Sequence, residues 1–141
     1  MAKELSGHCL CGAVTFTATP EKMEMGVCHC GMCRRWTGGT FMAVGCGTTV
    51  KVAQSENVGV YKSSDYGERC FCKKCGSTLF WRMQGGGMTV VSAQAFDDPA
   101  AFKFASQIYI DRKPANYEFA NQTTKMTEAE FLAAFMGKAN G

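Results

Sequence analysis

The chain has 141 residues, of which 46% are apolar, and it carries a formal net charge of +3. This length fits one domain, at residues 1–141, and the apolar fraction allows a core that does not rely on metal alone. The N-terminal stretch MAKELSGH has no apolar signal segment, and no apolar run approaches membrane-spanning length. We therefore expect a cytoplasmic protein that is not associated with a membrane.

Short runs of alternating apolar residues dominate the chain and predict strands. In chain order these runs are residues 12–19, 40–45, 57–62, 77–83, 88–95 and 106–111. The three glycines at 85–87 predict a hairpin connection, and residues 97–102 predict a single helical turn with Pro99 near its start. The stretch RRWTGG after Cys33 predicts a short turn or helix that ends at Gly38 and Gly39.

One longer helix is predicted near the C-terminus, at about residues 127–138. Thr127 and Glu130 have the spacing of a capping box. The apolar residues of this segment share one helical face and are Phe131, Leu132, Phe135 and Met136. The sequence therefore predicts a mainly β domain with a C-terminal α-helix.

The nine cysteines are not distributed as a disulfide framework would be, and their odd number argues against complete pairing. Eight of them form tight groups, which are Cys9 and Cys11; Cys28, Cys30 and Cys33; and Cys70, Cys72 and Cys75. Only Cys46 stands alone. In a cytosolic chain, where thiols stay reduced, such groups indicate metal ligands.

Two cysteine pairs have the form of half-sites for structural zinc. Cys72 and Cys75 make a C-x-x-C knuckle followed by Gly76, and a glycine there permits the positive φ of a tight turn. Cys9 and Cys11 also end in a glycine, with a shorter spacing. Each pair needs two more ligands for tetrahedral zinc, so the simplest closed site combines Cys9, Cys11, Cys72 and Cys75. The alternative is that both pairs are redox-active thiols.

The group Cys28, Cys30 and Cys33 offers three thiolates within six residues and has no fourth cysteine nearby. Zinc with three protein ligands and an open position is typical of a catalytic site. The alternative is that a fourth protein ligand closes the site. The candidates for that ligand are His8, His29, Cys46 and Cys70. His29 lies between two ligands, so we expect its side chain to point away from their metal.

Two cysteines are predicted to be bystanders. In an extended ERCFC segment, Cys70 and Cys72 point to the same side, so Cys70 is expected near the zinc of Cys72 without binding it. Both Cys70 and Cys46 are interpreted as small buried residues of the core.

Seven zinc-bound thiolates around two zinc ions would bring the net charge of the chain close to zero. Basic residues flank the cysteine groups and are Arg34, Arg35, Lys73 and Lys74. We interpret them as local partners of anionic metal centres, since a nucleic-acid face needs a larger positive excess. Arg34 and Arg35 also have the chemistry to hold a substrate carboxylate, although charge compensation explains them equally well.

Three motifs, GHCLCGAVTF, CHCGMCRR and FCKKCGSTLFW, occur in this order and together resemble the glutathione-dependent formaldehyde-activating (GFA) family, which includes the centromere protein V domain. The resemblance extends from about residue 5 to about residue 117, and the tail YEFANQTTKMTEAEFLAAF is similar to that of many bacterial members. It implies a zinc-stapled β-tent fold of small packed antiparallel sheets.

The resemblance also implies two zinc ions per chain, a structural one on Cys9, Cys11, Cys72 and Cys75 and a catalytic one on Cys28, Cys30 and Cys33. The implied activity is that of a carbon–sulfur lyase, which condenses glutathione with formaldehyde to S-(hydroxymethyl)glutathione. The partners would then be a small thiol such as glutathione and a small aldehyde. Two departures from the family pattern leave the substrate open, because Gln107 replaces a frequent His and Asn116 a frequent Trp.

The mechanism expected from these residues begins with a substrate thiol at the open position, where it loses its proton and attacks the aldehyde carbon. Arg34 or Arg35 would hold a substrate carboxylate, and His29 is a candidate proton carrier. A competing hypothesis is a non-catalytic, zinc-ribbon-like module that binds nucleic acid or a protein partner. The modest charge and the lack of a basic-aromatic stripe argue against nucleic acid. A redox or metal-buffer protein is a third alternative, and the oligomeric state is not determined by the sequence.

Overall fold

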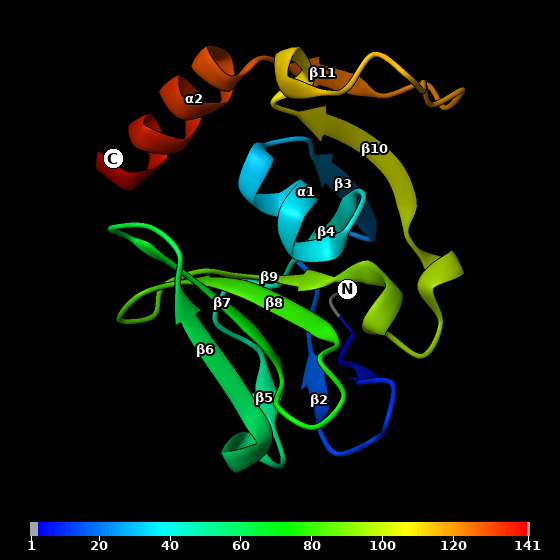
Figure 1. Ribbon diagram of the computed structural model, residues 1–141, viewed down its shortest axis with the longest axis vertical. Coiled ribbons are helices and arrows are strands. Elements are labelled where there is room, and N and C mark those ends of the chain that lie inside the picture. Colours follow the sequence, from blue (N-terminus) through cyan, green and yellow to red (C-terminus); the bar gives the residue numbers. More distant parts are fainter. Residues whose placement is uncertain (1–2, 141) are drawn as a thin grey trace.

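The computed structural model describes residues 3–140, with side chains for residues 3–136, and is shown in Figure 1. Its strands are β1 (Leu5–His8), β2 (Thr15–Ala18), β3 (Glu24–Cys28), β4 (Phe41–Gly45), β5 (Lys51–Val52), β6 (Val58–Lys62), β7 (Gly67–Cys72), β8 (Thr78–Met83), β9 (Thr89–Ser92), β10 (Lys103–Ile108) and β11 (Thr124–Met126). The α-helices are α1 (Gly31–Thr37) and α2 (Glu128–Asn140). The mainly β class and the C-terminal helix are thus confirmed.

The strands form two sheets. An eight-stranded sheet has the order β11-β10-β3-β4-β9-β8-β7-β6, and a three-stranded sheet has the order β1-β2-β5. Neighbouring strands are antiparallel except around β10, which runs parallel to both β3 and β11. The expectation of small antiparallel sheets therefore holds for most of the pairing, and the mixed end of the larger sheet differs from it.

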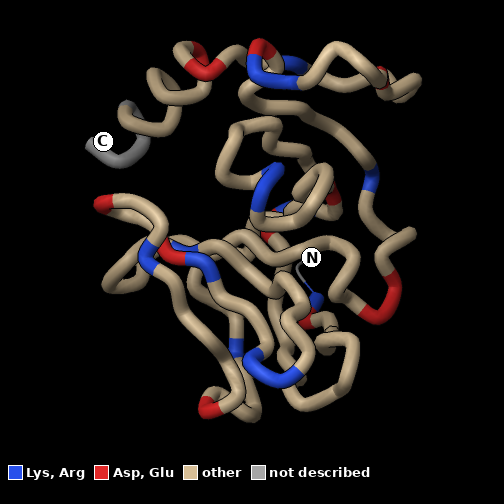
Figure 2. The backbone as a smooth tube through the Cα atoms, in the orientation of Figure 1, with Lys and Arg blue, Asp and Glu red and all other residues tan. Residues whose placement is uncertain are grey.

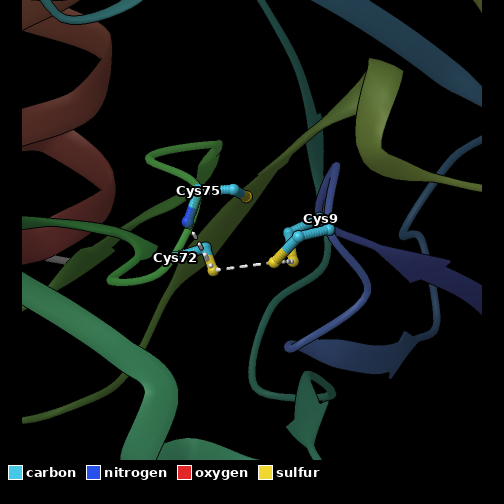
Figure 3. Close-up of side chains that lie close together, drawn as sticks. Cys9, Cys72 and Cys75 are labelled. Carbon is cyan, nitrogen blue, oxygen red and sulfur yellow. Dashed lines mark hydrogen bonds between the residues drawn. The ribbon is translucent and has the colours of Figure 1, made fainter.

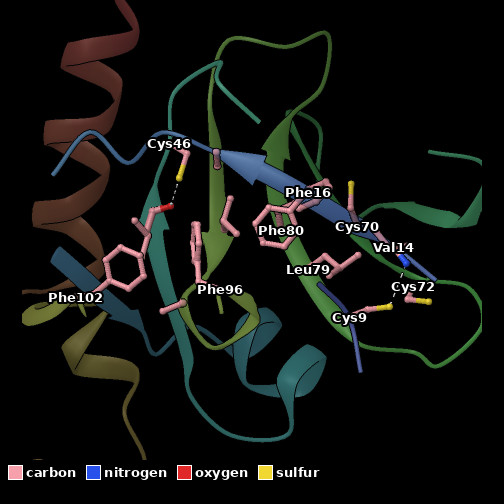
Figure 4. Packing of buried hydrophobic residues seen from close by; sticks show 14 residues of the cluster. Cys9, Val14, Phe16, Cys46, Cys70, Cys72, Leu79, Phe80, Phe96 and Phe102 are labelled. Carbon is pink, nitrogen blue, oxygen red and sulfur yellow. Dashed lines mark hydrogen bonds between the residues drawn. The ribbon is translucent and has the colours of Figure 1, made fainter. Parts of the chain in front are cut away.

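The hydrophobic core lies where the small sheet packs against the larger one (Figure 4). Phe16 of β2 meets Phe96 edge to face at a centroid distance of 5.4 Å and Phe80 of β8 at 6.5 Å. Such edge-to-face pairs stabilise a core beyond the area they bury. Cys46 and Cys70 are fully buried in this cluster, as the sequence predicted.

The short helix α1 follows β3 directly and begins with Cys30 as its N-cap residue. It ends at Gly38, whose φ of 74° lies in the left-handed region that glycine adopts without strain. Trp36 packs on Phe41 of the next strand at a centroid distance of 5.1 Å. The predicted helix after Cys33 is therefore present and ends at the predicted glycine.

The C-terminal helix α2 begins with the predicted capping box. The Thr127 backbone N–H donates to Glu130 Oε1 at 2.8 Å, and the Glu130 backbone N–H donates to Thr127 Oγ1 at 3.1 Å. Phe131 and Phe135 face inward, whereas Met136 is 51% exposed, so the apolar face is narrower than predicted. In Figure 1, α2 runs from β11 toward the loop between β6 and β7.

The segment after β10 departs from the predicted strand at 106–111. The strand begins earlier, at Lys103, and ends at Ile108, because Tyr109 takes a left-handed φ of 56° and the next residues form a 3-10 turn (Ile110–Arg112). Another 3-10 turn, Pro99–Ala101, is the predicted helical turn.

Basic and acidic residues are interspersed along the backbone (Figure 2). Within residues 3–140, none of the helices has both the length and the apolar character that a membrane crossing requires.

Candidate metal centres and functional site

A first cysteine cluster joins the beginning of the chain to the end of β7. Cys9 and Cys11 lie in the turn after β1, Cys72 ends β7, and Cys75 lies in the following turn. The four sulfur atoms lie within 4.8 Å of one another. Cys11 Sγ is 3.7 Å from Cys9 Sγ and 3.8 Å from Cys72 Sγ (Figure 3). The structure therefore brings together the four residues that the sequence grouped.

The backbone around this cluster directs hydrogen-bond donors at the sulfurs. The Val14 N–H donates to Cys9 Sγ at 3.3 Å, and the Lys74 N–H donates to Cys72 Sγ at 3.3 Å. The Ser77 hydroxyl, 3.2 Å from Cys75 Sγ, lowers the pKa of Cys75 to about 5. These donors stabilise thiolates, and four convergent thiolates match the donor set of a structural zinc site.

Both knuckle glycines have the positive φ that the sequence analysis required. Gly12 has a φ of 79° and Gly76 a φ of 80°. No neighbouring atom crowds either position, so backbone conformation rather than space calls for glycine there.

A second cluster lies at the junction of β3 and α1. Cys28 ends β3, Cys30 caps α1 and Cys33 lies in its first turn. Their sulfurs lie within 4.8 Å of one another. Hydrogen bonds from the Cys28 thiol, and then from the Cys33 thiol, lower the pKa of Cys30 to about 2. The hydrogen bond to Cys30 correspondingly raises the pKa of Cys28, so negative charge concentrates on Cys30.

No further His, Cys, Asp or Glu in the described part of the chain joins this three-cysteine cluster. His8 lies elsewhere, where its Nδ1–H donates to the Cys9 carbonyl at 2.7 Å and its Nε2 is 3.6 Å from Asp97. Burial raises the pKa of Cys46 to about 12 and that of Cys70 to about 11, as expected for neutral core thiols. Three sulfur donors with room for one more ligand fit a zinc ion that keeps an open position.

His29 belongs to a separate buried network. Its Nε2–H donates to Gln107 Oε1 at 2.8 Å, and Gln107 Nε2 donates to Thr123 Oγ1 at 2.9 Å. The Tyr117 hydroxyl lies 3.4 Å from His29 Nδ1. The side chain thus points away from the cysteines, and both ring nitrogens have partners within the protein. Gln107 is therefore buried against His29, which lies between two of the cluster cysteines in the sequence. Asn116 is exposed.

The arginines after the cluster bind the backbone of its own loop. Arg34 Nε donates to the His29 carbonyl at 3.1 Å, and Arg35 Nη1 donates to the Gly31 carbonyl at 3.3 Å. Arg34 is half-buried and Arg35 is exposed. Their contacts within the chain are therefore local, and a role toward a substrate carboxylate stays a prediction.

Arg69 is a site residue that the sequence analysis missed. It lies on β7, is 5% exposed, and its Nη1 donates to Cys33 Sγ at 3.5 Å. Its guanidinium stacks 4.9 Å from the Trp36 ring, and its Nε donates to Ser63 Oγ at 3.1 Å. A buried cation that is held on three sides supplies fixed positive charge to the cysteine cluster. The only signal in the sequence that could have pointed to Arg69 is its position directly before Cys70 of a cysteine group.

Tyr109 directly follows Ile108, the β10 residue that is paired with Cys28 of the cluster. It is the one residue other than glycine with positive φ in the described chain. Burial, together with the nearby Tyr66 and Cys28, raises its pKa to about 12. A phenol with this pKa stays protonated at neutral pH and remains a hydrogen-bond donor. The strained backbone at Tyr109 is consistent with a functional demand on the direction of its side chain.

Comparison with known proteins agrees with this geometry. The model of the family described as glutathione-dependent formaldehyde-activating enzyme matches residues 4–112. An uncharacterised lyase of Schizosaccharomyces pombe is 38% identical over 134 residues, which cover 94% of this chain and 98% of that protein. A candidate glutathione-dependent formaldehyde-activating enzyme of Halomonas elongata is 34% identical over 85 residues, or 54% of each chain.

A solved structure has a similar fold. A Rhodobacter sphaeroides protein superposes with a TM-score of 0.58 at 22% identity, over 66% of this chain and 88% of that one. The family match and the yeast relative both span most of the chain. The chain therefore belongs to the glutathione-dependent formaldehyde-activating family.

Proposed function

We infer that the protein is a zinc-dependent enzyme of the carbon–sulfur lyase type, which makes or cleaves the adduct of a small thiol and an aldehyde. Glutathione and formaldehyde are the pair that the family description names. The observation that carries this proposal is a three-thiol cluster, beside a buried arginine, that no fourth described side chain completes. The donor set of the four-cysteine cluster supports a second, structural zinc.

In the proposed site, Cys28, Cys30 and Cys33 would hold one zinc ion, and Cys9, Cys11, Cys72 and Cys75 the other. The zinc of the three-cysteine cluster would supply Lewis acidity that lowers the pKa of a substrate thiol. Arg69 fixes Cys33 from the buried side and offsets the negative charge of the cluster. The exposed Arg35, with Arg34 behind it, is suited to a substrate carboxylate.

The bond changes of the proposed reaction are simple. The substrate sulfur attacks the aldehyde carbon, a carbon–sulfur bond forms, and the electron pair of the carbonyl π bond moves to the oxygen. We assign to Tyr109 the hydrogen bond to this oxygen, because Tyr109 directly follows Ile108, which is paired with Cys28. A proton on the oxygen completes the hemithioacetal, and the reverse sequence expels the thiolate.

Cobalt substitution tests this proposal directly, because thiolate number and geometry set the visible spectrum. We expect millimolar glutathione to change the spectrum of the three-cysteine site in the wild-type protein. Tyr109→Phe should keep this change but lose about 10²-fold in the rate of adduct formation, which is typical of one positioned donor. A spectrum that ignores every thiol would contradict an open substrate position.

A further inference from the structure

A cavity of about 230 Å³ lies between α2 and the strands β10 and β11. The strand β10 also pairs with β3, which ends at Cys28 of the three-cysteine cluster. The side chains that give the cavity its apolar character are Ile108, Met126, Phe131, Ala134 and Phe135. No charged residue lines it. The reaction proposed above, with glutathione and formaldehyde, gives this space no role.

Strand register connects the cavity to the cysteine cluster. Ile108 of β10 is paired with Cys28 of β3 on one side and with Met126 of β11 on the other. Paired residues of neighbouring strands present their side chains on the same face of a sheet. The floor of the cavity is therefore continuous with the face that presents Cys28.

Aromatic rings form the wall above this floor. Phe131 lies 5.7 Å from Tyr109 and is stacked on Phe135 at 5.7 Å, and Phe135 lies 5.9 Å from Tyr66. Tyr109 directly follows Ile108, the residue that is paired with Cys28. Aromatic rings thus line the way from the end of β10 to α2.

The size and lining of the cavity define what it can hold. An engineered apolar cavity of roughly 150 Å³ accommodates benzene, and this one is larger. Three neutral polar residues, Ser106, Gln107 and Thr124, complete the lining. Formaldehyde has no substituent to place there, and charged groups of glutathione would find no partner of opposite charge in it. A short alkyl chain or a phenyl ring would be bound favourably.

We propose that this cavity is a subsite for an alkyl or aryl substituent of the thiol–aldehyde adduct. The proposal rests on the proposed function and adds the substrate class, an adduct with an apolar group on its aldehyde or its thiol. The family match ends at residue 112, whereas Met126 and the residues of α2 lie beyond it. The subsite therefore combines β10, inside the family match, with the C-terminal segment beyond it.

The first test probes the cavity without any thiol chemistry. The zinc-bound protein, labelled with ¹³C at its methionine methyl groups, is titrated with 1-hexanol and followed by NMR. Met126 lines the cavity and should shift, whereas Met136, which lies outside the lining, should not. Ala134→Phe should abolish the shift by filling the cavity, because Ala134 belongs to the lining. Ala133→Phe, the neighbouring position outside the lining, should leave the shift unchanged. An unshifted Met126 would overturn the proposal.

The second test links the cavity to the cysteine cluster. Cobalt-substituted protein is titrated with ethanethiol, 1-butanethiol and 1-hexanethiol, and separately with glutathione plus formaldehyde, butanal or hexanal. Each methylene that enters the cavity should strengthen apparent binding about fourfold, as burial of apolar surface predicts. The thiol series and the aldehyde series distinguish which half of the adduct carries the substituent.

Failure of this proposal differs from failure of the proposed function. If small thiols change the spectrum but affinity does not rise with chain length in either series, the subsite is wrong and the open centre stands. If no thiol changes the spectrum, the proposed function fails, and the substrate class fails with it. A chain-length gain that survives Ala134→Phe also overturns the subsite.

Discussion

At the scale of single residues, Arg69 is the group that most clearly distinguishes the two cysteine clusters. It is buried, donates to Cys33 Sγ and has no counterpart at the four-cysteine cluster among the described contacts. Groups that hydrogen-bond metal ligands typically change metal affinity by about 10- to 100-fold when they are removed. The charge at Arg69 should therefore control how firmly the three-cysteine site holds its metal.

We predict that Arg69→Met loses metal from the three-cysteine site to a chelator at about 10-fold lower chelator concentration than the wild type does. The four-cysteine site should be unaffected. Chelator competition followed by zinc counting measures this effect. Arg82→Met is the matched control, because Arg82 is paired with Glu68 at 3.5 Å and has no described hydrogen bond to Cys33. Equal retention in both variants would show that Arg69 has only a packing role.

The pKa values make a second prediction, on thiol reactivity in protein from which a mild chelator has removed only the metal of the three-cysteine site. A lowered pKa leaves Cys30 as a thiolate at pH 6, whereas a raised pKa keeps Cys46 and Cys70 neutral there. Because the thiolate is the nucleophile, iodoacetamide at pH 6 should modify Cys30 first. Peptide mass spectrometry measures the order in which the cysteines are modified. Early modification of Cys46 or Cys70 would mean that the core opens or that the assignments are reversed.

Residue spacing predicted which cysteines come together, because a C-x-x-C turn followed by a glycine can adopt only a few backbone conformations. It did not predict Arg69. That contact joins β7 to α1 across the sheet, and one arginine in a strand carries no sign of its distant partner. The direction of the His29 side chain, by contrast, followed from its position between two residues that share a metal.

At the scale of elements, the strands predicted from alternation are those with one buried face. Alternation did not predict the strands β1, β3, β5, β7 and β11, although the ERCFC segment within β7 was expected to be extended. In β7, nearly every residue from Gly67 to Cys72 is buried. The strand β10 ends early at Tyr109, whose left-handed backbone is set by tertiary contacts rather than by local preference. The capping box of α2 is local, and so the start of that helix was predicted correctly.

The capping box gives the prediction at this scale. Thr127→Ala removes the hydroxyl that accepts the Glu130 N–H, and loss of such a cap typically costs about 1 kcal/mol of helix stability. We expect faster hydrogen exchange in α2, weaker binding of 1-hexanol, and little change in the unfolding of the sheets. Thr127→Ser, which retains the hydroxyl, should behave as the wild type does. Unchanged exchange in Thr127→Ala would show that packing alone holds α2.

At the scale of the whole molecule, the two clusters close loops of very different length. The four-cysteine cluster joins Cys11 to Cys72 and closes a loop that contains four of the eight strands of the large sheet, whereas the other cluster spans Cys28 to Cys33. Structural zinc contributes roughly 10–16 kcal/mol to the folding of zinc-finger peptides at neutral pH. Loss of the first metal should therefore threaten the fold, and loss of the second should cost little stability.

The family and the mainly β class were predictable because the motifs are dense and local. The sequence did not make two features predictable, namely the parallel end of the large sheet and the cavity that α2 forms there. They depend on how β10 and β11 pair across a connection of fifteen residues between Ile108 and Thr124. Long-range pairing of this kind leaves little trace in a single sequence.

Zinc counting by native mass spectrometry, together with the melting temperature, tests most directly whether the four-cysteine site is structural and the three-cysteine site catalytic. Wild type and Cys70→Ser should each carry two zinc ions. Cys33→Ser should fold, melt near the wild-type temperature and carry one, whereas Cys72→Ser should be insoluble or strongly destabilised. This assignment of the two sites is contradicted if Cys33→Ser melts at a temperature as low as that of Cys72→Ser, or if Cys70→Ser loses a zinc ion.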